Sequence, residues 1–295
     1  MENAMENKIK NIACVGCLSK DKSFFGKKSG FSLYKCLNCG MISLYDLPKS
    51  SSEVYDAEYF SGGGGGFGYV NYDEDKEPMR EGFKKYLKMI EKLLNGKGKL
   101  FDVGAATGFF MALAKDAGFT VSGVELSAFA AGKARERGLD VSTGTLNGVN
   151  EPAGSYDVLT LLDVIEHMPE PEKDIEVSAQ MLRKGGLIVI NTPDSGSSYA
   201  KAMGMKWHLI VPPEHIHYFN ENGIRMLLER NSFETLLVTR IGKKFTLEYV
   251  FNMLFKWLKI QAFQTIATKI KGTKLGTLSF PINFRDNMFV IARKK

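Results

Sequence analysis

The chain has 295 residues, of which 44% are hydrophobic and 24% are charged. This balance excludes a disordered or fibrous chain and allows one large or two modest globular domains. No run of about 18 apolar residues without charge occurs, so we expect no membrane-spanning helix. The first residues, MENAMENKIK, lack the apolar segment of a secretory signal, so we expect a cytoplasmic protein.

The net charge of +6 is unevenly spread. Residues 240–295 carry twelve Lys and Arg but only two acids, Glu248 and Asp286, so this segment has a local charge of +10 and the rest of the chain about −4. Any interaction with an anionic partner is therefore expected to involve the C-terminal segment.

Four cysteines open the chain as two C-x-x-C pairs, Cys14 with Cys17 and Cys36 with Cys39. Two such pairs, 18 residues apart, have the spacing of a tetrahedral zinc site. Disulfides do not suit a reducing cytoplasm, and a redox motif needs only one pair. All four ligands are thiolates, which predicts a closed structural site. We therefore expect residues 1–50 to form a zinc ribbon with short strands at 31–36 and 40–45.

Residues 51–77 contain five consecutive glycines at 62–66. Ordering such a run costs much backbone entropy. Two interpretations stay open for this Gly-rich segment, a flexible linker or a mobile flap over a site.

From residue 78 onward, apolar strand-like segments alternate with amphipathic helical ones. This alternation is typical of an α/β fold with a doubly wound, parallel, Rossmann-like sheet. The predicted strands lie at 100–103, 119–124, 139–142, 156–162, 187–191, 233–240 and 287–292, and the predicted helices at 78–94, 109–117, 128–137, 172–182 and 223–230.

The first predicted strand ends in a glycine turn, D-V-G-A-A-T-G over 102–108. Gly104 and Gly108 bracket a bend where the backbone can approach a ligand, and the following helix offers free N–H groups. The second strand ends at Glu125, where a carboxylate can accept both ribose hydroxyls of a nucleoside. Asp102 favours a ligand with an amino-acid cation over one with a pyrophosphate, which disfavours a nicotinamide dinucleotide.

These residues resemble the class I S-adenosylmethionine (SAM)-dependent methyltransferases over roughly 78–240 and the final strand. D-V-G-A-A-T-G is similar to that family's D-x-G-x-G-x-G motif, with Ala106 in place of the middle glycine. The methyl group of Ala106 can be tolerated if the turn keeps a negative φ there, although it narrows the approach of a ligand slightly. The segment P-P-E-H-I-H-Y-F at 212–219 resembles a small-molecule branch that often carries a four-cysteine ribbon.

The resemblance implies a seven-stranded, mostly parallel sheet with an antiparallel last strand, in a SAM-binding domain over 78–295. Thr145 stands where the family often has an acid for the adenine amine, so we expect a hydroxyl or backbone contact there. The cofactor-binding residues that we predict are Asp102, Gly104, Ala105, Ala106, Gly108, Glu125, Leu126, Thr145, Leu146, Leu162 and Asp163.

All four histidines follow the fourth or fifth predicted strand, near the expected mouth of the site. A hydroxyl nucleophile needs a proton acceptor with a pKa near 7, which suits histidine. We predict His215 or His217 as the base, with His167 lining the cofactor side. Alternatively, Asp163, Glu166 and His167 chelate a divalent ion such as Mg²⁺, as similar sets do in some quinone-type O-methyltransferases.

The pattern of residues 245–271 predicts a helix with one polar stripe and a wide apolar face. We expect this helix to belong to a helical insertion over 245–275. Three interpretations stay open for this apolar face. It packs against the protein's own core or a dimer mate, it forms a lid over an apolar acceptor, or it lies on a membrane surface.

We therefore expect a SAM-dependent methyltransferase acting on a hydroxyl or carbon of a small molecule, such as a sugar, a quinone-like or a lipid-linked compound, and no nucleic-acid partner. The alternative is an RNA-modifying methyltransferase that uses ribbon lysines and the basic C-terminal segment. Against it, the loop after the fourth strand is D-V-I-E-H, and aromatic residues do not alternate with those lysines. A nucleotide sensor without activity is a third interpretation.

Overall fold

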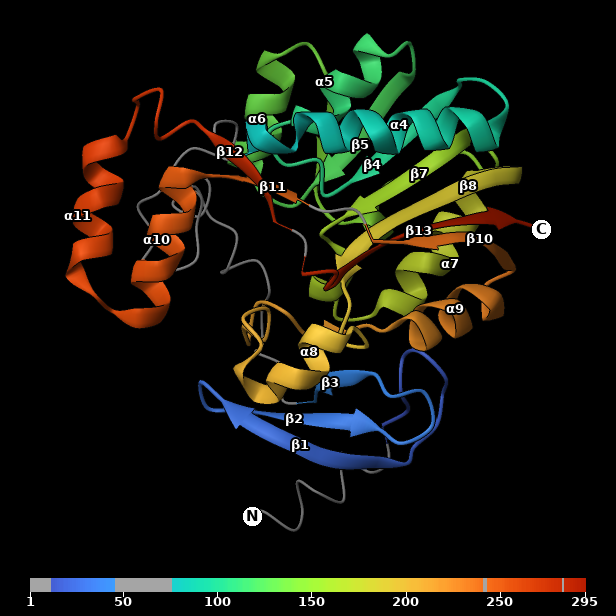
Figure 1. The fold of residues 1–295 in the computed structure, drawn as a ribbon. Coiled ribbons are helices and arrows are strands. Elements are labelled where there is room, and N and C mark those ends of the chain that lie inside the picture. The colour runs from blue at the N-terminus through green and yellow to red at the C-terminus, as the bar shows by residue number, and fades with distance from the viewer. Residues whose placement is uncertain (1–11, 46–75, 241–242, 283) are drawn as a thin grey trace.

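The structure is a computed structural model that describes residues 12–45, 76–240, 243–282 and 284–295. A large sheet flanked by helices forms the body, and a small sheet from the N-terminal segment lies beneath it (Figure 1). The glycine run at 62–66 and most of the predicted linker lie outside the described residues. The domain boundaries at 50 and 78 therefore stay predictions.

The body is a seven-stranded sheet in the order β10-β13-β8-β7-β4-β5-β6. Strands β4, β5, β6, β7 and β8 are parallel, and β13 runs antiparallel to both of its neighbours. The predicted Rossmann-like sheet with an antiparallel last strand is confirmed. The strands are β4 (Lys99–Val103), β5 (Thr120–Glu125), β6 (Asp140–Thr143), β7 (Tyr156–Leu162), β8 (Leu182–Pro193), β10 (Phe233–Thr239) and β13 (Asn287–Lys294).

Helices cover both faces of this sheet (Figure 1). One face carries α4 (Arg80–Leu94), α5 (Phe109–Asp116) and α6 (Ala128–Glu136), and the other carries α7 (Pro171–Met181) and α9 (Glu221–Arg230). Short 3-10 turns complete the connections at η1 (Glu77–Met79), η2 (Leu146–Gly148), η3 (Ile165–His167) and η4 (Gly204–Lys206), the last following α8 (Ser198–Met203).

The alternation of side chains along each strand builds two cores. In β8, Leu187 and Val189 join the core under α4 and α5, whereas Ile188 and Ile190 join the core under α7 and α9. Because both faces of β8 are buried, residues 187–190 form a continuous apolar run, which is why the sequence predicted this strand well.

The N-terminal sheet contains β1 (Lys22–Lys28), β2 (Phe31–Cys36), β3 (Ile42–Leu44) and β9 (His217–Tyr218), in that order. Strand β9 comes from the body of the protein and pairs antiparallel with β3. Apolar residues of the ribbon, such as Leu33, share a core with Trp207 and Tyr218. The ribbon is therefore joined to the body by backbone hydrogen bonds and by a common core.

The segment between β10 and β13 forms a separate arm on one side of the body (Figure 1). It contains β11 (Lys243–Thr246) paired with β12 (Ser279–Ile282), and the helices α10 (Leu247–Leu258) and α11 (Gln261–Ile270). The single helix predicted over 245–271 is wrong, because Lys259 takes a left-handed φ of 55° and ends α10. The chain then folds back, so that Phe251 stacks on Phe263 and part of the apolar face is covered. Across the described residues, no helix has both the length and the apolar character to cross a bilayer.

Candidate functional site

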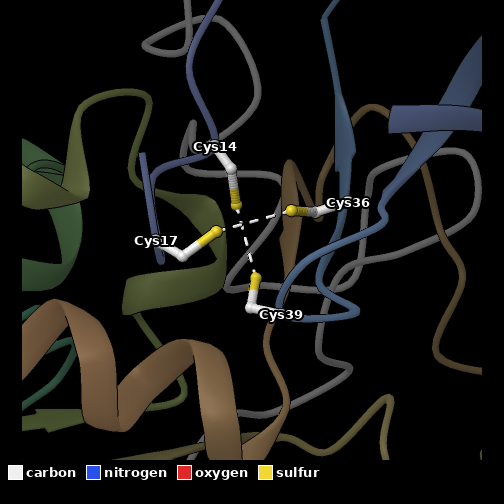
Figure 2. A group of neighbouring side chains, drawn as sticks. All are labelled: Cys14, Cys17, Cys36 and Cys39. Atoms are coloured by element: carbon white, nitrogen blue, oxygen red, sulfur yellow. Dashed lines mark hydrogen bonds between the residues drawn. The ribbon is translucent and has the colours of Figure 1, made fainter. Parts of the chain in front are cut away.

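The four cysteines converge at the end of the ribbon, with their sulfurs pointing toward one another (Figure 2). The Sγ atoms of Cys14 and Cys39 are 3.6 Å apart, and those of Cys17 and Cys36 are 3.5 Å apart. A tetrahedral Zn–thiolate site with bonds of about 2.3 Å has sulfurs about 3.8 Å apart. The donor set therefore fits a zinc ion. The hydrogen bond from Cys39 lowers the pKa of Cys14, which favours its thiolate form.

Helix α9 supports this cysteine knuckle from the body of the protein. The Arg230 guanidinium donates to the backbone carbonyls of Val15 and Gly16 and also pairs with Glu172 of α7 at 2.8 Å. The Asn220 side chain, at the start of α9, donates to the carbonyl of Cys39 at 2.9 Å. The two cysteine loops are thus held by side chains distant in sequence.

The glycine loop between β4 and α5 bends sharply at two positions. Gly104 has a φ of 70°, and a Cβ there would lie 2.6 Å from Val164 Cγ2. Gly108 has a φ of 81°, and a Cβ there would lie 2.4 Å from Leu139 Cδ1. Both positions therefore need glycine for backbone conformation and for space.

Ala106 does not meet the condition of a negative φ. Its φ is 48°, so an alanine occupies the left-handed region that favours glycine. The Glu125 carboxylate holds it there by accepting the Ala106 N–H at 2.8 Å. The same carboxylate accepts the Ser127 N–H at 2.8 Å, and burial raises the pKa of Glu125.

A cavity of about 320 Å³ opens at the carboxyl ends of β4, β5 and β7, where the strand order reverses. Eight of the predicted site residues line it, namely Gly104, Ala106, Glu125, Leu126, Thr145, Leu146, Leu162 and Asp163, and so does His167. The structure thus brings these predicted residues to one cavity.

Asp102, Ala105 and Gly108 do not line this cavity. Asp102 is buried beneath the loop, where it accepts a hydrogen bond from Thr160 at 2.5 Å. Burial raises its pKa to about 7. Asp102 therefore lies below the loop and outside the cavity, whereas the sequence suggested that it would contact the amino-acid cation of a ligand.

The sequence did not single out Lys76, Asn147 and Asp174, which also line the cavity. Lys76 is buried, and its Nζ lies 3.8 Å from an oxygen of Asp163. Asn147 donates to Asp174 at 2.7 Å, and burial raises the pKa of Asp174 to about 6. Thr145 stands where related proteins often have an acid, and Asp174 supplies a carboxyl group to the lining of the same cavity. No motif marks these residues. Lys76 and Asp174 are distinguished only by the burial of a charged side chain, and Asn147 only by its bond to Asp174.

The histidines lie in different surroundings. His167 lines the cavity, and its ring meets that of His215 at 4.7 Å between centroids. His217 lies at the junction of ribbon and body, where its Nδ1 bonds Ser43 Oγ at 3.0 Å and burial lowers its pKa to about 4. His208 lies 3.8 Å from Asp286. Only His167 and His215 therefore adjoin one another beside the cavity.

A family model described as a methyltransferase domain matches residues 75–238, which span β4 to β10 and the whole cavity. The chain belongs to this methyltransferase family. The match begins next to Lys76, at the first described residues of the body, and it leaves out the ribbon and the arm.

Curated relatives of this methyltransferase include ubiquinone biosynthesis O-methyltransferases. The protein from Azoarcus sp. strain BH72 is 36% identical over 107 residues, which cover 34% of this chain and 45% of that protein. The protein from Thiobacillus denitrificans is 31% identical over 133 residues, 42% of this chain and 57% of that protein. The chain spans about half the length of the curated relatives it matches.

Solved structures show the same fold. A SAM-dependent methyltransferase from Thermotoga maritima has a TM-score of 0.52 at 18% identity, covering 76% of this chain and 94% of that one. A SAM-dependent methyltransferase from Archaeoglobus fulgidus has a TM-score of 0.50 at 20% identity, and the match covers 76% of this chain and 99% of that one. The fold of the body is therefore the methyltransferase fold predicted from the sequence.

Proposed function

We propose that this chain transfers a methyl group from SAM to a hydroxyl or carbon of a small molecule. The observation that carries the proposal is the cavity where the Gly104 loop and Glu125 meet at the reversal of strand order. The ubiquinone biosynthesis O-methyltransferase relatives favour a hydroxyl of a quinone-like compound as acceptor over a sugar or an RNA.

The walls of the cavity suit the parts of SAM. Glu125 has a buried carboxylate beside the loop and would accept the ribose hydroxyls. The Lys76 ammonium would pair with the methionine carboxylate, and Asp163 with its amino group. Leu126, Thr145, Leu146 and Leu162 would enclose the less polar parts. We assign the adenine amine to the pair formed by Asn147 and Asp174.

When bound, SAM supplies a methyl group that is already activated on a sulfonium, so the chain needs mainly to orient the acceptor. A hydroxyl acceptor also needs a group that lowers its pKa or takes its proton. Glu166, His167 and His215 form a compact cluster beside the cavity, and we assign the acceptor-facing role to it. His217, buried against Ser43, would instead position β9.

We propose that the four cysteines hold a structural zinc ion, because their sulfurs have the separations of a tetrahedral site. The ion would stabilise a ribbon whose buried apolar residues belong to cores shared with the body.

We further propose that the arm binds a membrane surface from which a lipid-linked acceptor is reached. Leu258, Ile260 and Ile266 are exposed large apolar residues on α10 and α11 or the turn between them. Lys259 and Lys269 lie among them, and such a combination suits an anionic bilayer. Sedimentation with phosphatidylglycerol vesicles should carry the protein down, and a Leu258→Ser, Ile260→Ser variant should stay in solution. Self-association through the same face, with no vesicle binding, would replace this proposal by the dimer.

Calorimetry with SAM and with S-adenosylhomocysteine tests the function first, with micromolar binding expected. Transfer of labelled methyl from SAM is then measured to catechol-type and quinol-type acceptors, to nucleotide sugars and to bulk RNA. Label in the catechol and quinol acceptors supports the proposal. The absence of binding heat with both cofactor forms overturns it, and label in RNA alone overturns the acceptor class.

A further inference from the structure

Three side chains with metal-ligand atoms converge beside the cofactor cavity. One ligand atom each from Glu166, His167 and His215 lies within 4.8 Å of the others. Glu166 and His167 lie on η3, directly after β7, and His215 lies just before β9. His167 itself lines the cavity, so the cluster borders the space where an acceptor would lie.

Backbone carbonyls orient both imidazole rings. His167 Nδ1 is 2.8 Å from the carbonyl of Glu214, and His215 Nδ1 is 2.9 Å from the carbonyl of Leu209. A carbonyl oxygen can only accept, so Nδ1 carries a hydrogen in both rings, and a metal ion would be bound through Nε2. This arrangement is typical of metal-binding histidines, which donate their other N–H to a carbonyl or carboxylate.

The carboxylate is held in the same manner. Glu166 is 1% exposed, and its Oε2 accepts the Thr192 hydroxyl at 2.8 Å. Its Oε1 lies on the side of His167, 4.0 Å from Nε2. The backbone carbonyl of Glu166 also accepts the Ile216 N–H at 2.8 Å, so the segments that carry the three side chains are bonded to each other. A buried carboxylate facing two imidazoles gains most from a cation between them.

We propose that Glu166, His167 and His215 bind a divalent first-row transition-metal ion, with open coordination positions toward the cavity. Two imidazoles and one carboxylate suit Zn²⁺, Fe²⁺ or Co²⁺, whereas Mg²⁺ prefers a shell of oxygen ligands. The site differs from the Mg²⁺ set predicted from the sequence, because Asp163 is not part of the cluster. Asp163 instead lies near Lys76 and accepts a hydrogen bond from Asn191.

A role for the ion rests on the proposed function, although its binding does not. An ion in this position would coordinate an acceptor hydroxyl and lower its pKa, which meets the requirement of O-methylation for a nucleophilic oxygen. The proton would then leave to solvent or to a carboxylate of the cavity wall.

Metal content of the full chain tests the site. The metal-free protein is titrated with Co²⁺, and we expect two ions per chain. The cysteine site should give intense thiolate charge-transfer absorption, and the second site only weak d–d bands. Cys17→Ser should weaken the first signal alone. Glu166→Gln and His215→Gln should each weaken binding of the second ion by about 10-fold or more while the thiolate signal stays.

His208→Gln serves as the matched control, because His208 lies near Asp286 and outside the cluster. It should retain both ions. Circular dichroism and binding of S-adenosylhomocysteine check that each variant is folded. Only one Co²⁺ per wild-type chain, or an unchanged second ion in His215→Gln, overturns the site. If two ions bind but SAM does not, the proposed function fails and the metal site stands.

Discussion

The carboxylate of Glu125 accepts the backbone N–H of Ala106 at 2.8 Å, so the acid at the end of β5 holds the loop that follows β4. Two neighbouring strands thereby fix one wall of the cofactor cavity. Glu125 has two tasks, to hold the loop and, as proposed, to bind the ribose.

Replacing Glu125 by Gln should weaken the binding of S-adenosylhomocysteine about 10-fold to 100-fold. Both carboxylate oxygens accept backbone N–H groups, and the amide of Gln would turn a donor toward one of them. Calorimetry measures the affinity. Glu136→Gln, on the exposed end of α6, is the control and should bind like wild type. Equal affinities for both variants would remove Glu125 from the site.

Lys76→Met should weaken the binding of SAM by about 10-fold but leave that of decarboxylated SAM nearly unchanged. The reason is that the buried ammonium is assigned to the methionine carboxylate, which the second ligand lacks. Lys84→Met, an exposed position on α4, is the control. A parallel loss for both ligands would indicate that Lys76 only supports the fold.

Ala106→Gly should raise the free energy of unfolding slightly, by less than about 1 kcal/mol. Removing the methyl group relieves the strain of the positive φ, which stabilises the folded state by about 1–2 kcal/mol. The greater conformational entropy of glycine in the unfolded chain offsets part of this stabilisation. Gly104→Ala should lower the free energy of unfolding, because φ is 70° and the new Cβ meets Val164. Urea unfolding of both variants measures the contrast; the same sign for both would contradict the loop geometry.

Asp102→Asn should change how stability depends on pH. Burial raises the pKa of Asp102 in the folded state to about 7 from an ordinary value of 3.8, so the folded state holds a proton that the unfolded state releases. This contribution is complete below pH 4, falls as pH rises and is lost above pH 7, at up to about 1.4 kcal/mol per pH unit. The variant keeps an acceptor for Thr160 but does not titrate.

Unfolding curves from pH 5 to 8 should therefore show the stability of wild type falling relative to that of Asp102→Asn. Asp116→Asn, at an exposed position of α5, provides the comparison and should run parallel to wild type. Parallel curves for Asp102→Asn as well would mean that Asp102 is ionised in the folded protein.

Arg230→Met should make the cysteine site release the proposed zinc ion faster to a chelator, by about 10-fold. Arg230 donates to two carbonyls of the first cysteine loop, and methionine keeps the apolar stem but loses these bonds. Arg225→Met, on the same helix and paired with Glu221, controls for the loss of charge. A release rate that is the same for both would show that α9 does not support the site.

The sequence predicted the seven strands of the body because the central ones, such as β7 and β8, are buried apolar runs, and the edge strands β6 and β10 follow helices in the same alternation. It did not predict β1, whose residues include none that are buried, so its pattern carries little signal. The sign of φ at Ala106 was also beyond the sequence, because it depends on Glu125 from another strand. Lys76 and Asp174 reach the cavity only through tertiary packing, and the pairing of His167 with His215 depends on contacts between distant segments.

The pairing of β3 with β9 has a consequence for exchanging parts between relatives. Ile42 lies opposite Tyr218, and Ser43 opposite His217, so each side of this seam is shaped by the other. A chimera that receives only a foreign ribbon would present mismatched side chains to a strand two residues long. The interchangeable unit is therefore discontinuous, consisting of the N-terminal ribbon together with the segment from Trp207 to Asn220.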